Sequence, residues 1–460
     1  MLATTNLESR IADWIFRLDA RTLPSAVIEK LKLATLDTFA AMLSGVTEPV
    51  TQKVVAFVVE PDGRGEASII GQRARARSVG AALANGTMAH ACDYDDSSWT
   101  MWGHPTAPVL AAVLAVAEQR NLSGIDLLSG IAVGLEIEKT LGLGCQPEHY
   151  NRGYHPTGSL GVFGAAAGAA KMLGLSPDQI RMGLGISASR AAALRGNSGT
   201  MTKPLHVGFA ARDGVEAAAL AGAGVTASPS AVSGALGFFD VCAPDHGDLD
   251  WIADRLGNPF DVIDPGLSPK LYPSCSETHS AVDAILAMRA EGLKPGDVRK
   301  IRAGITPAAR DGLVYSNPTT PLQAKFSQEY CLAAPLIRGK LGLAEFDLAV
   351  VQDPAIRAMI ARVEVAVHPD LSGPDSVSFS SPAIVEVETH DGRTLRKLVR
   401  EMKGHPKNPI PASDIEAKFI ECGDRVLPRD MVRRALAKIQ KLDQLASIKD
   451  LIDDLQPPSK

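Results

Sequence analysis

The chain has 460 residues, of which 45% are hydrophobic and 22% charged, as is usual for a globular protein long enough for more than one hydrophobic core. Its formal net charge of -5 excludes the strongly basic surfaces that bind nucleic acid and gives no polybasic patch for a membrane. The six cysteines lack Cys-x-x-Cys spacing, so the sequence predicts reduced thiols rather than a disulfide framework or a zinc site.

The N-terminus has no charged segment followed by an apolar one. No apolar run reaches the roughly 18 residues that cross a membrane. We therefore expect no signal peptide, no membrane-spanning helix and a cytoplasmic location.

Residues 1–267 carry mainly helical patterns. Apolar side chains recur at helical spacing between residues 7 and 45, with a break at Leu23-Pro24. Further helices are predicted over residues 50–60, 78–91, 108–119, 124–141, 161–173 and 209–220. Their many alanine and glycine residues, in a chain with only 5% aromatic residues, indicate closely packed helices with small contact residues.

A first group of ionisable residues follows the predicted helix at 78–91. Residues 89–105 include the side chains of His90, Asp93, Asp95, Asp96 and His104. The glycine and proline in this stretch predict a loop, and a loop held by rigid helices is where catalytic groups often lie. The Asp95-Asp96 pair resembles a metal-binding or acid/base pair, although a helix N-cap with solvated carboxylates is the alternative.

A second group centres on His155 in the stretch Tyr-His-Pro-Thr-Gly (154–158). This stretch cannot lie within a helix, because proline removes a donor and disfavours helical geometry in the residue before it. His104 also precedes a proline. Both imidazoles are therefore expected on stiffened backbone, either as positioned groups or as structural loop residues.

A third group is Thr-Lys-Pro-Leu-His-Val-Gly (202–208), which opens the predicted helix at 209–220. Lys203 at a helix N-terminus opposes the helix dipole, which indicates another role, such as binding a substrate carboxylate. An exposed lysine is the alternative. His206 either faces inward or caps the turn.

A fourth group lies in residues 265–279, where dense proline and glycine predict a domain boundary and a crossing strand. Lys270 and Tyr272 would share one face of that strand. His279 would lie in the first turns of a helix from 278 to 291. Cys275 would need a nearby base to act as a nucleophile, and burial is the commoner fate of such a thiol.

The remaining sequence predicts a smaller α/β part and a helical return. Strands are predicted over residues 298–305, 363–368 and 383–389, with a hairpin turn at 390–393, and helices over 413–455. The predicted fold is therefore mainly α with an α+β part. Residues 1–267 and 403–460 would form a large all-helical domain, and residues 268–402 an α/β lid domain with an antiparallel sheet.

The candidate groups suit proton abstraction beside a carboxylate. Histidines exchange protons near neutral pH, and lysines hold carboxylates or stabilise an enolate-like charge. The sequence has no HExxH or GxSxG motif, no strand-bound GxGxxG and no GxxxxGK[ST] motif, which argues against zinc, hydrolase and nucleotide-cofactor chemistry. A three-histidine metal site is conceivable, but the two lysines would repel the cation.

Together these stretches resemble the MmgE/PrpD family. The matching pieces recur in order over most of the chain: Ala-His-Ala-x-Asp-Tyr-Asp-Asp (89–96), Gly-His-Pro (103–105), Tyr-His-Pro-Thr-Gly (154–158), Thr-Lys-Pro-Leu-His-x-Gly (202–208), Lys-x-Tyr-Pro-x-Cys-x-x-x-His (270–279) and Ala-Lys-Phe-Ser-x-x-Tyr (324–330). The resemblance implies a helical domain built from both chain ends, an α/β lid and a homodimer. It also implies a site in the cleft between the domains, with no metal and no organic cofactor.

The resemblance implies binding roles for some matched residues. Lys203 and Lys270 would hold carboxylates of a small carboxylate substrate. Tyr272 and His206 are further substrate-binding candidates, although Tyr272 could simply pack.

It also implies proton-transfer roles for others. His104 and His155 would act as acid and base, and His279 would assist from the lid. Asp93 would orient a histidine or bind a polar group of the substrate, with a buried cap as the alternative.

Members of the family dehydrate 2-methylcitrate, decarboxylate cis-aconitate or epimerise iminodisuccinate, and each reaction develops carbanion-like charge next to a carboxylate. The leading hypothesis is a cofactor-independent lyase acting on a di- or tricarboxylate. The alternatives are an isomerase that epimerises a small imino- or amino-dicarboxylate, and a non-catalytic dimeric binding protein. Residues 97–102 lie between matched pieces, and their two rings, Trp99 and Trp102, are expected to narrow the pocket toward a smaller diacid.

Overall fold

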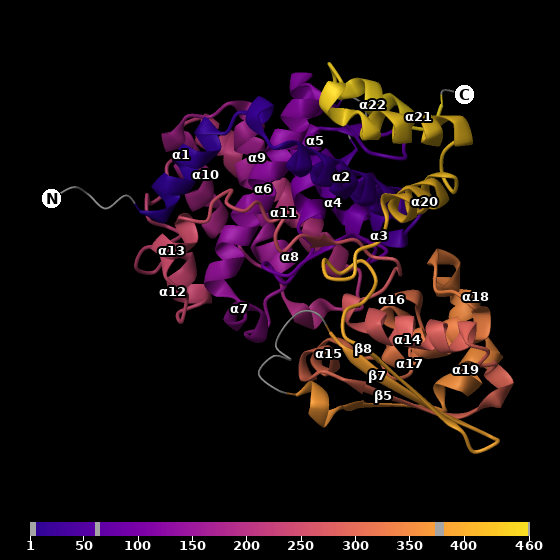
Figure 1. The fold of residues 1–460 in the computed structure, drawn as a ribbon. Helices are drawn as coiled ribbons and strands as arrows, with labels where there is room; N and C mark the ends of the chain where they lie inside the picture. Colours follow the sequence, from indigo (N-terminus) through magenta and orange to yellow (C-terminus); the bar gives the residue numbers. More distant parts are fainter. Residues whose placement is uncertain (1–5, 60–64, 373–380, 459–460) are drawn as a thin grey trace.

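The computed structural model describes residues 6–59, 65–372 and 381–458, which form two parts (Figure 1). The larger part is helical and contains both ends of the described chain, and the smaller part carries the main sheet. We call them the helical body and the lid. Residues 1–5, on which the signal-peptide prediction partly rests, lie outside the described residues. Across the described residues, no helix combines the length and apolar character needed to span a membrane.

The helical body draws its helices from both ends of the chain. The first set is α1 (Leu7–Arg17), α2 (Ser25–Gly45), α3 (Pro49–Val58), α4 (Ser78–His90), α5 (Thr106–Arg120), α6 (Gly124–Cys145), α7 (Glu148–Asn151), α8 (Pro156–Ser159), α9 (Gly161–Leu173), α10 (Pro177–Ala188), α11 (Thr202–Gly222), α12 (Phe238–Cys242) and α13 (Leu249–Ala253). The second set is α20 (Ala412–Gly423), α21 (Arg429–Gln440) and α22 (Lys449–Asp454). α20 packs on α2, as Figure 1 shows, and α21 also contacts α2, so the predicted return of the chain to the helical part is confirmed.

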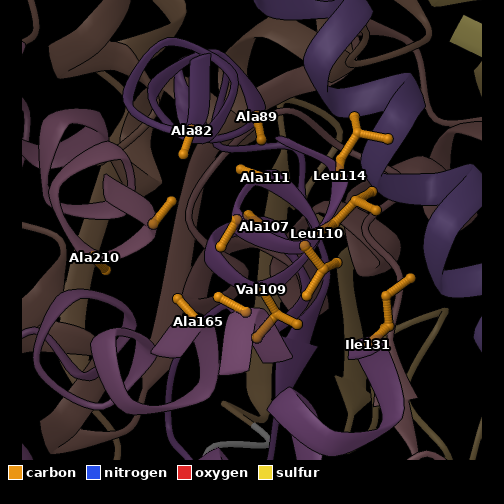
Figure 2. Packing of buried hydrophobic residues seen from close by; sticks show 14 of the residues in the cluster. Ala82, Ala89, Ala107, Val109, Leu110, Ala111, Leu114, Ile131, Ala165 and Ala210 are labelled. Carbon is orange, nitrogen blue, oxygen red and sulfur yellow. The ribbon is translucent and has the colours of Figure 1, made fainter. Parts of the chain in front are cut away.

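Small side chains let the helices of the body approach closely. Figure 2 shows Ala89 of α4, Ala165 of α9 and Ala210 of α11 within one cluster of buried apolar residues. A Cβ added to Gly208 of α11 would lie 2.2 Å from Thr87 Oγ1 of α4, so only glycine permits this contact. The approach brings the end of α4 beside the start of α11, where two of the candidate stretches lie.

The lid is a four-stranded sheet with helices packed on it. Its strands, in the order β6-β5-β7-β8, are β5 (Val298–Ile305), β6 (Val363–Val367), β7 (Ala383–Thr389) and β8 (Thr394–Val399). Its helices are α14 (His279–Ala290), α15 (Pro307–Gly312), α16 (Pro321–Ala324), α17 (Gln328–Arg338), α18 (Leu348–Val351) and α19 (Pro354–Ile360). The lid buries its own apolar core, separate from that of the helical body. The domain boundaries at residues 267 and 403 stay a prediction.

The sheet is mixed rather than antiparallel throughout. β7 pairs antiparallel with both β5 and β8, as predicted, but β5 and β6 run parallel. The reason is the connection between β5 and β6, which is a long crossover containing helices α15 to α19 and not a hairpin.

The helix expected from residue 209 begins earlier, at Thr202. Pro204 does not prevent this, because proline is tolerated in the first turn of a helix, where its missing N–H has no partner to lose. Lys203 and His206 therefore lie in the first two turns of α11, on one rigid element.

The strand expected through Lys270 and Tyr272 is also shorter than predicted. It ends at β4 (Leu267–Ser268), which pairs with β3 (Ser97–Ser98) in the loop after α4. Two prolines flank the segment from Lys270 to Tyr272, and proline cannot donate to a strand ladder. The two side chains consequently do not share a strand face.

A buried lysine joins the C-terminal helices to the rest of the molecule. Nζ of Lys418, on α20, donates hydrogen bonds to Asp37 Oδ1 of α2 (2.7 Å) and to the carbonyl oxygens of Tyr94 (2.6 Å) and Lys270 (3.1 Å). Lys418 and Asp37 are both buried. One ammonium group thus holds together three segments that are far apart in the sequence.

We predict that Lys418→Met lowers the free energy of unfolding by about 3 kcal/mol, because a carboxyl group and two carbonyl groups stay buried without their donor. Equilibrium urea unfolding measures this change. Lys53→Met, on the exposed side of α3, is the control and should change the unfolding free energy by less than about 0.5 kcal/mol. Equal values for the two variants would contradict the role given to the Lys418 ammonium.

Candidate active site

The loop between α4 and α5 has its backbone held by buried donors. Three consecutive carbonyl oxygens each accept a hydrogen bond from a different buried lysine: Cys92 O from Lys325 (2.9 Å), Asp93 O from Lys270 (3.0 Å) and Tyr94 O from Lys418 (2.6 Å). Asp93 has φ +53°, in the left-handed region that aspartate adopts more readily than most residues. These contacts determine the direction of the Asp93 side chain.

The Asp93 carboxylate lies between two ammonium groups. Nζ of Lys203, in the first turn of α11, lies 2.6 Å from Asp93 Oδ2, and Nζ of Lys270, from the segment leading into the lid, contacts Oδ1. Burial by itself raises the pKa of Asp93, but the two ammonium groups outweigh it and hold that pKa well below its usual range. The Asp95 carboxylate, hydrogen-bonded to His90, belongs to the same cluster and also has a depressed pKa, so the two ammonium charges face two carboxylates.

Two imidazoles lie against this group. The Nδ1–H of His104 donates to the carbonyl oxygen of Asp96 (2.9 Å), which leaves its Nε2 unprotonated, 3.9 Å from Asp93 Oδ1. The Nδ1–H of His90 donates to Asp95 Oδ1 (2.8 Å), and the centroids of the two imidazole rings are 4.6 Å apart. Both rings therefore keep one nitrogen that can accept a proton.

His155 is oriented by two neighbours. Its Nδ1 lies 3.1 Å from Nδ1 of His206, and its Nε2 lies 3.1 Å from Thr157 Oγ1. The ring centroids of His155 and His104 are 6.4 Å apart. His206 lines a separate depression on the outer side of α11, so the structure places it behind His155.

Burial keeps these imidazoles uncharged. It lowers the pKa of His104 well below its usual range, and the Lys270 ammonium lowers that pKa further. Burial does the same to the pKa of His155, with the Lys203 ammonium as the second cause. Burial also lowers the pKa of His206, to about 4. Because neutral imidazoles are bases, this cluster can accept a proton.

A pocket opens beside the cluster, between the helical body and the lid. The body contributes Trp102, Gly103, His104, Tyr150, His155, Arg195, Ser198 and Lys203, and the lid contributes Cys275, Ser276, Glu277, Gly312 and Phe326. Of the two tryptophans expected at the pocket, Trp102 belongs to this lining, with its ring edge-on to Tyr150 (5.6 Å between centroids). Trp99 instead donates its Nε1–H to Ser268 Oγ (2.8 Å) and packs on His405.

Three predicted residues lie behind this lining. Lys270 is fully buried beneath Asp93 (0% exposed). Tyr272 donates its hydroxyl to Asp283 Oδ1 (2.6 Å) and packs edge-on to His279. The His279 Nε2–H donates to a main-chain carbonyl (3.2 Å), and burial lowers the pKa of this imidazole to about 3. Their predicted roles in binding and proton transfer stay predictions.

The cluster has the spacing of a metal site, with two ammonium groups beside it. The ligand atoms of His90, His104 and His155 lie within 4.8 Å of one another, as do those of His90, Asp93, Asp95 and His104. The ammonium groups of Lys203 and Lys270 contact the Asp93 carboxylate and would repel a cation there. A site without a metal ion stays a prediction.

Several pocket residues were missed by the sequence analysis. Tyr150 and Arg195 belong to no motif, and they meet because the Arg195 guanidinium stacks on the Tyr150 ring (3.7 Å to the centroid). Glu277 lies inside a matched stretch, but only the folded chain brings it to the pocket. His90 was noted in the first stretch without a role, and its position five residues before Asp95, its carboxylate partner, could have identified the pair.

Comparison with known proteins matches the chain to two family models. The MmgE/PrpD N-terminal domain matches residues 9–248 and the MmgE/PrpD C-terminal domain matches residues 272–444. The cis-aconitate decarboxylase of Homo sapiens is 28% identical, covering 99% of this chain and 95% of that protein. The cis-aconitate decarboxylase of Aspergillus terreus is 26% identical (100% and 97%), and the 2-methylcitrate dehydratase of Salmonella typhimurium is 25% identical (81% and 80%).

We predict that Asp93→Asn lowers the free energy of unfolding by about 3 kcal/mol at neutral pH, because two buried ammonium groups lose the carboxylate between them. Because the pKa of Asp93 is depressed, this stabilisation is present at neutral pH and is lost only as the pH falls below the ordinary aspartate range. Urea unfolding should also show that adding Lys203→Met to the Asp93→Asn variant restores part of the stability. A double variant less stable than Asp93→Asn alone would contradict the pairing.

Proposed function

This chain belongs to the MmgE/PrpD family, and from that premise we propose that it is a cofactor-independent lyase acting on a di- or tricarboxylate. The observation that carries the proposal is the pocket lining, in which the uncharged imidazoles of His104 and His155 stand beside the cations Lys203 and Arg195. Cations of this kind hold carboxylates, and a neutral imidazole takes up a proton. The lining therefore provides for both substrate binding and the proton transfer.

In this proposal the substrate is bound through its carboxylates, and its reacting carbon faces the imidazoles. Lys203 and Arg195 bind the carboxylates, and the charge that develops next to one of them is stabilised by the Lys203 ammonium. In a dehydration, His104 or His155 takes the proton from that carbon and the hydroxyl leaves as water. In a decarboxylation, the carbon–carbon bond breaks, carbon dioxide leaves, and a proton is added to carbon. Lys270 takes part indirectly, because it shares Asp93 with Lys203.

Among the lyases we place decarboxylation of an unsaturated tricarboxylate first. The two cis-aconitate decarboxylases match 99% and 100% of this chain, whereas the 2-methylcitrate dehydratase matches 81%. The second candidate is an epimerase of a small imino- or amino-dicarboxylate. It is favoured by the presence of ionisable groups on both walls of the pocket, since epimerisation removes a proton from one face of a carbon and returns it to the other.

We predict that the purified protein releases carbon dioxide from cis-aconitate, and does so in the presence of EDTA. Parallel incubations with cis-aconitate, 2-methylcitrate and iminodisuccinate in deuterium oxide, followed by absorbance, carbon dioxide and NMR, separate the three reactions. Uptake of deuterium with inversion of a carbon centre, but without release of carbon dioxide or formation of a new double bond, would favour the epimerase over the lyase. Binding of these acids without any turnover would indicate a binding protein.

We predict that His104→Ala and Lys203→Ala each lower kcat by about 100-fold or more, because one removes a proton acceptor and the other a cation beside the developing charge. Steady-state kinetics measures both effects, and Lys203→Ala should also raise KM because it weakens carboxylate binding. Exposed residues of the same types give the controls His246→Ala and Lys53→Ala, which should keep the full rate. Full activity in both active-site variants would show that these roles are assigned wrongly.

A further inference from the structure

The lid wall of the pocket carries a second ionisable pair that the roles above leave unused. Glu277 lies in a short turn, Ser276–Thr278, directly before α14. Its Oε2 accepts a hydrogen bond from the Cys275 thiol (3.5 Å), and its Oε1 accepts one from the Tyr150 hydroxyl (3.3 Å). Glu277 and Cys275 both line the pocket that His104 and His155 line from the helical body.

The Glu277 carboxyl group is held in one place from several sides. Gly312, at the end of α15, has its backbone so close that an added Cβ would lie 1.9 Å from Glu277 Oε2. Tyr150 is itself held by the Arg195 guanidinium on its ring. Only 5% of Glu277 is exposed, and that part faces the pocket. These contacts therefore hold the Glu277 carboxyl group in a fixed position at the pocket wall.

We propose that Glu277, seated against the Cys275 thiol, is the proton donor of the reaction and acts from the lid wall, across the pocket from His104 and His155, which serve as the base where the reaction removes a proton from carbon. This role rests on the lyase function proposed above.

The protons and bonds balance without any further reactant. In a decarboxylation, the bond to the departing carboxylate breaks, carbon dioxide leaves, and the electron pair is taken into the system conjugated with the remaining carboxylate. The O–H bond of Glu277 then breaks as the new C–H bond forms, and the carboxylate left on Glu277 takes a proton from water. In a dehydration, the same proton would go to the leaving hydroxyl and release water.

The ionisation behaviour of the pocket groups agrees with this division. Burial raises the pKa of Glu277 to about 7, against the opposing effect of the Arg195 guanidinium and weaker effects of Cys275, Tyr150 and Lys203. Environments that separate the pKa values of neighbouring groups in this way assign one as acid and the other as base. Burial also raises the pKa of the Cys275 thiol, which therefore stays protonated and positions Glu277 rather than attacking the substrate.

The decisive experiment is Glu277→Gln, measured as a pH profile of kcat/KM with the acid that the wild-type protein turns over. Since Glu277 must be protonated to donate, wild-type kcat/KM should fall about tenfold per pH unit above about pH 7. The variant should lose about 100-fold or more in kcat, keep KM within about threefold, and lack this alkaline limb. Glu329→Gln is the matched control, because Glu329 is also a buried lid glutamate with a raised pKa but does not line the pocket, and it should behave as wild type.

A second variant tests the position of the carboxyl group without removing it. Gly312→Ala forces Glu277 Oε2 to move and should lower kcat by about tenfold or more. Gly296→Ala, where an added Cβ meets no atom within 4 Å in the described structure, is its control. If Glu277→Gln fails to fold, the kcat of Gly312→Ala still tests the role of Glu277.

Two results would overturn the role of Glu277, and they can be told apart. If the wild-type protein turns over none of cis-aconitate, 2-methylcitrate and iminodisuccinate, the proposed function is wrong, and the role of Glu277 falls with it. If the wild-type protein is active, and Glu277→Gln or Gly312→Ala has the same kcat and the same fall of kcat/KM above about pH 7, only the role of Glu277 is overturned.

Discussion

A single buried carboxylate shared by two ammonium groups determines the chemistry of the surrounding site. Asp93 holds the ammonium groups of Lys203 and Lys270 where water screens their charges poorly. Lys203 also lines the pocket, where its ammonium group can meet a carboxylate. Together with burial, these ammonium groups keep His104 and His155 uncharged, although free histidine titrates near neutral pH. One electrostatic arrangement thus underlies both the proposed binding of carboxylates and the availability of basic nitrogens.

The two walls of the pocket carry groups that burial shifts in opposite directions. Burial disfavours the charged form on both walls: it keeps the imidazoles neutral, with help from the nearby ammonium groups, and it keeps the proton on Glu277 against the opposing effects of Arg195, Cys275 and Tyr150. Residue type alone would suggest the opposite assignment, with the carboxylate as base and the histidines as acids. Burial and neighbouring charge reverse it, and neither can be judged from composition.

The sequence predicted the fold class and those site residues that lie next to prolines, because proline restricts the backbone locally whatever the tertiary structure. His104, His155 and Lys203 are of this kind, and the structure brings them together. Lys270 and Tyr272 were expected on one strand face, but the strand ends at Ser268 and their side chains follow separate tertiary partners. The parallel pair in the lid sheet was missed for a similar reason, since alternation of apolar residues does not reveal strand direction. Tyr150, Arg195 and Glu277 required the folded chain, because they meet from three distant segments.

The lysine-bound carbonyls of residues 92–94 have a consequence for how the molecule exchanges material with solvent. Lys270 and Lys325 come from the side of the lid, so swinging the lid away from the body would break these hydrogen bonds and expose their ammonium and carbonyl groups to water. Exchanging a hydrogen bond of a charged group for one to water costs about 1.5–3 kcal/mol. The same bonds therefore oppose the separation that would widen the pocket for the entry and departure of small molecules.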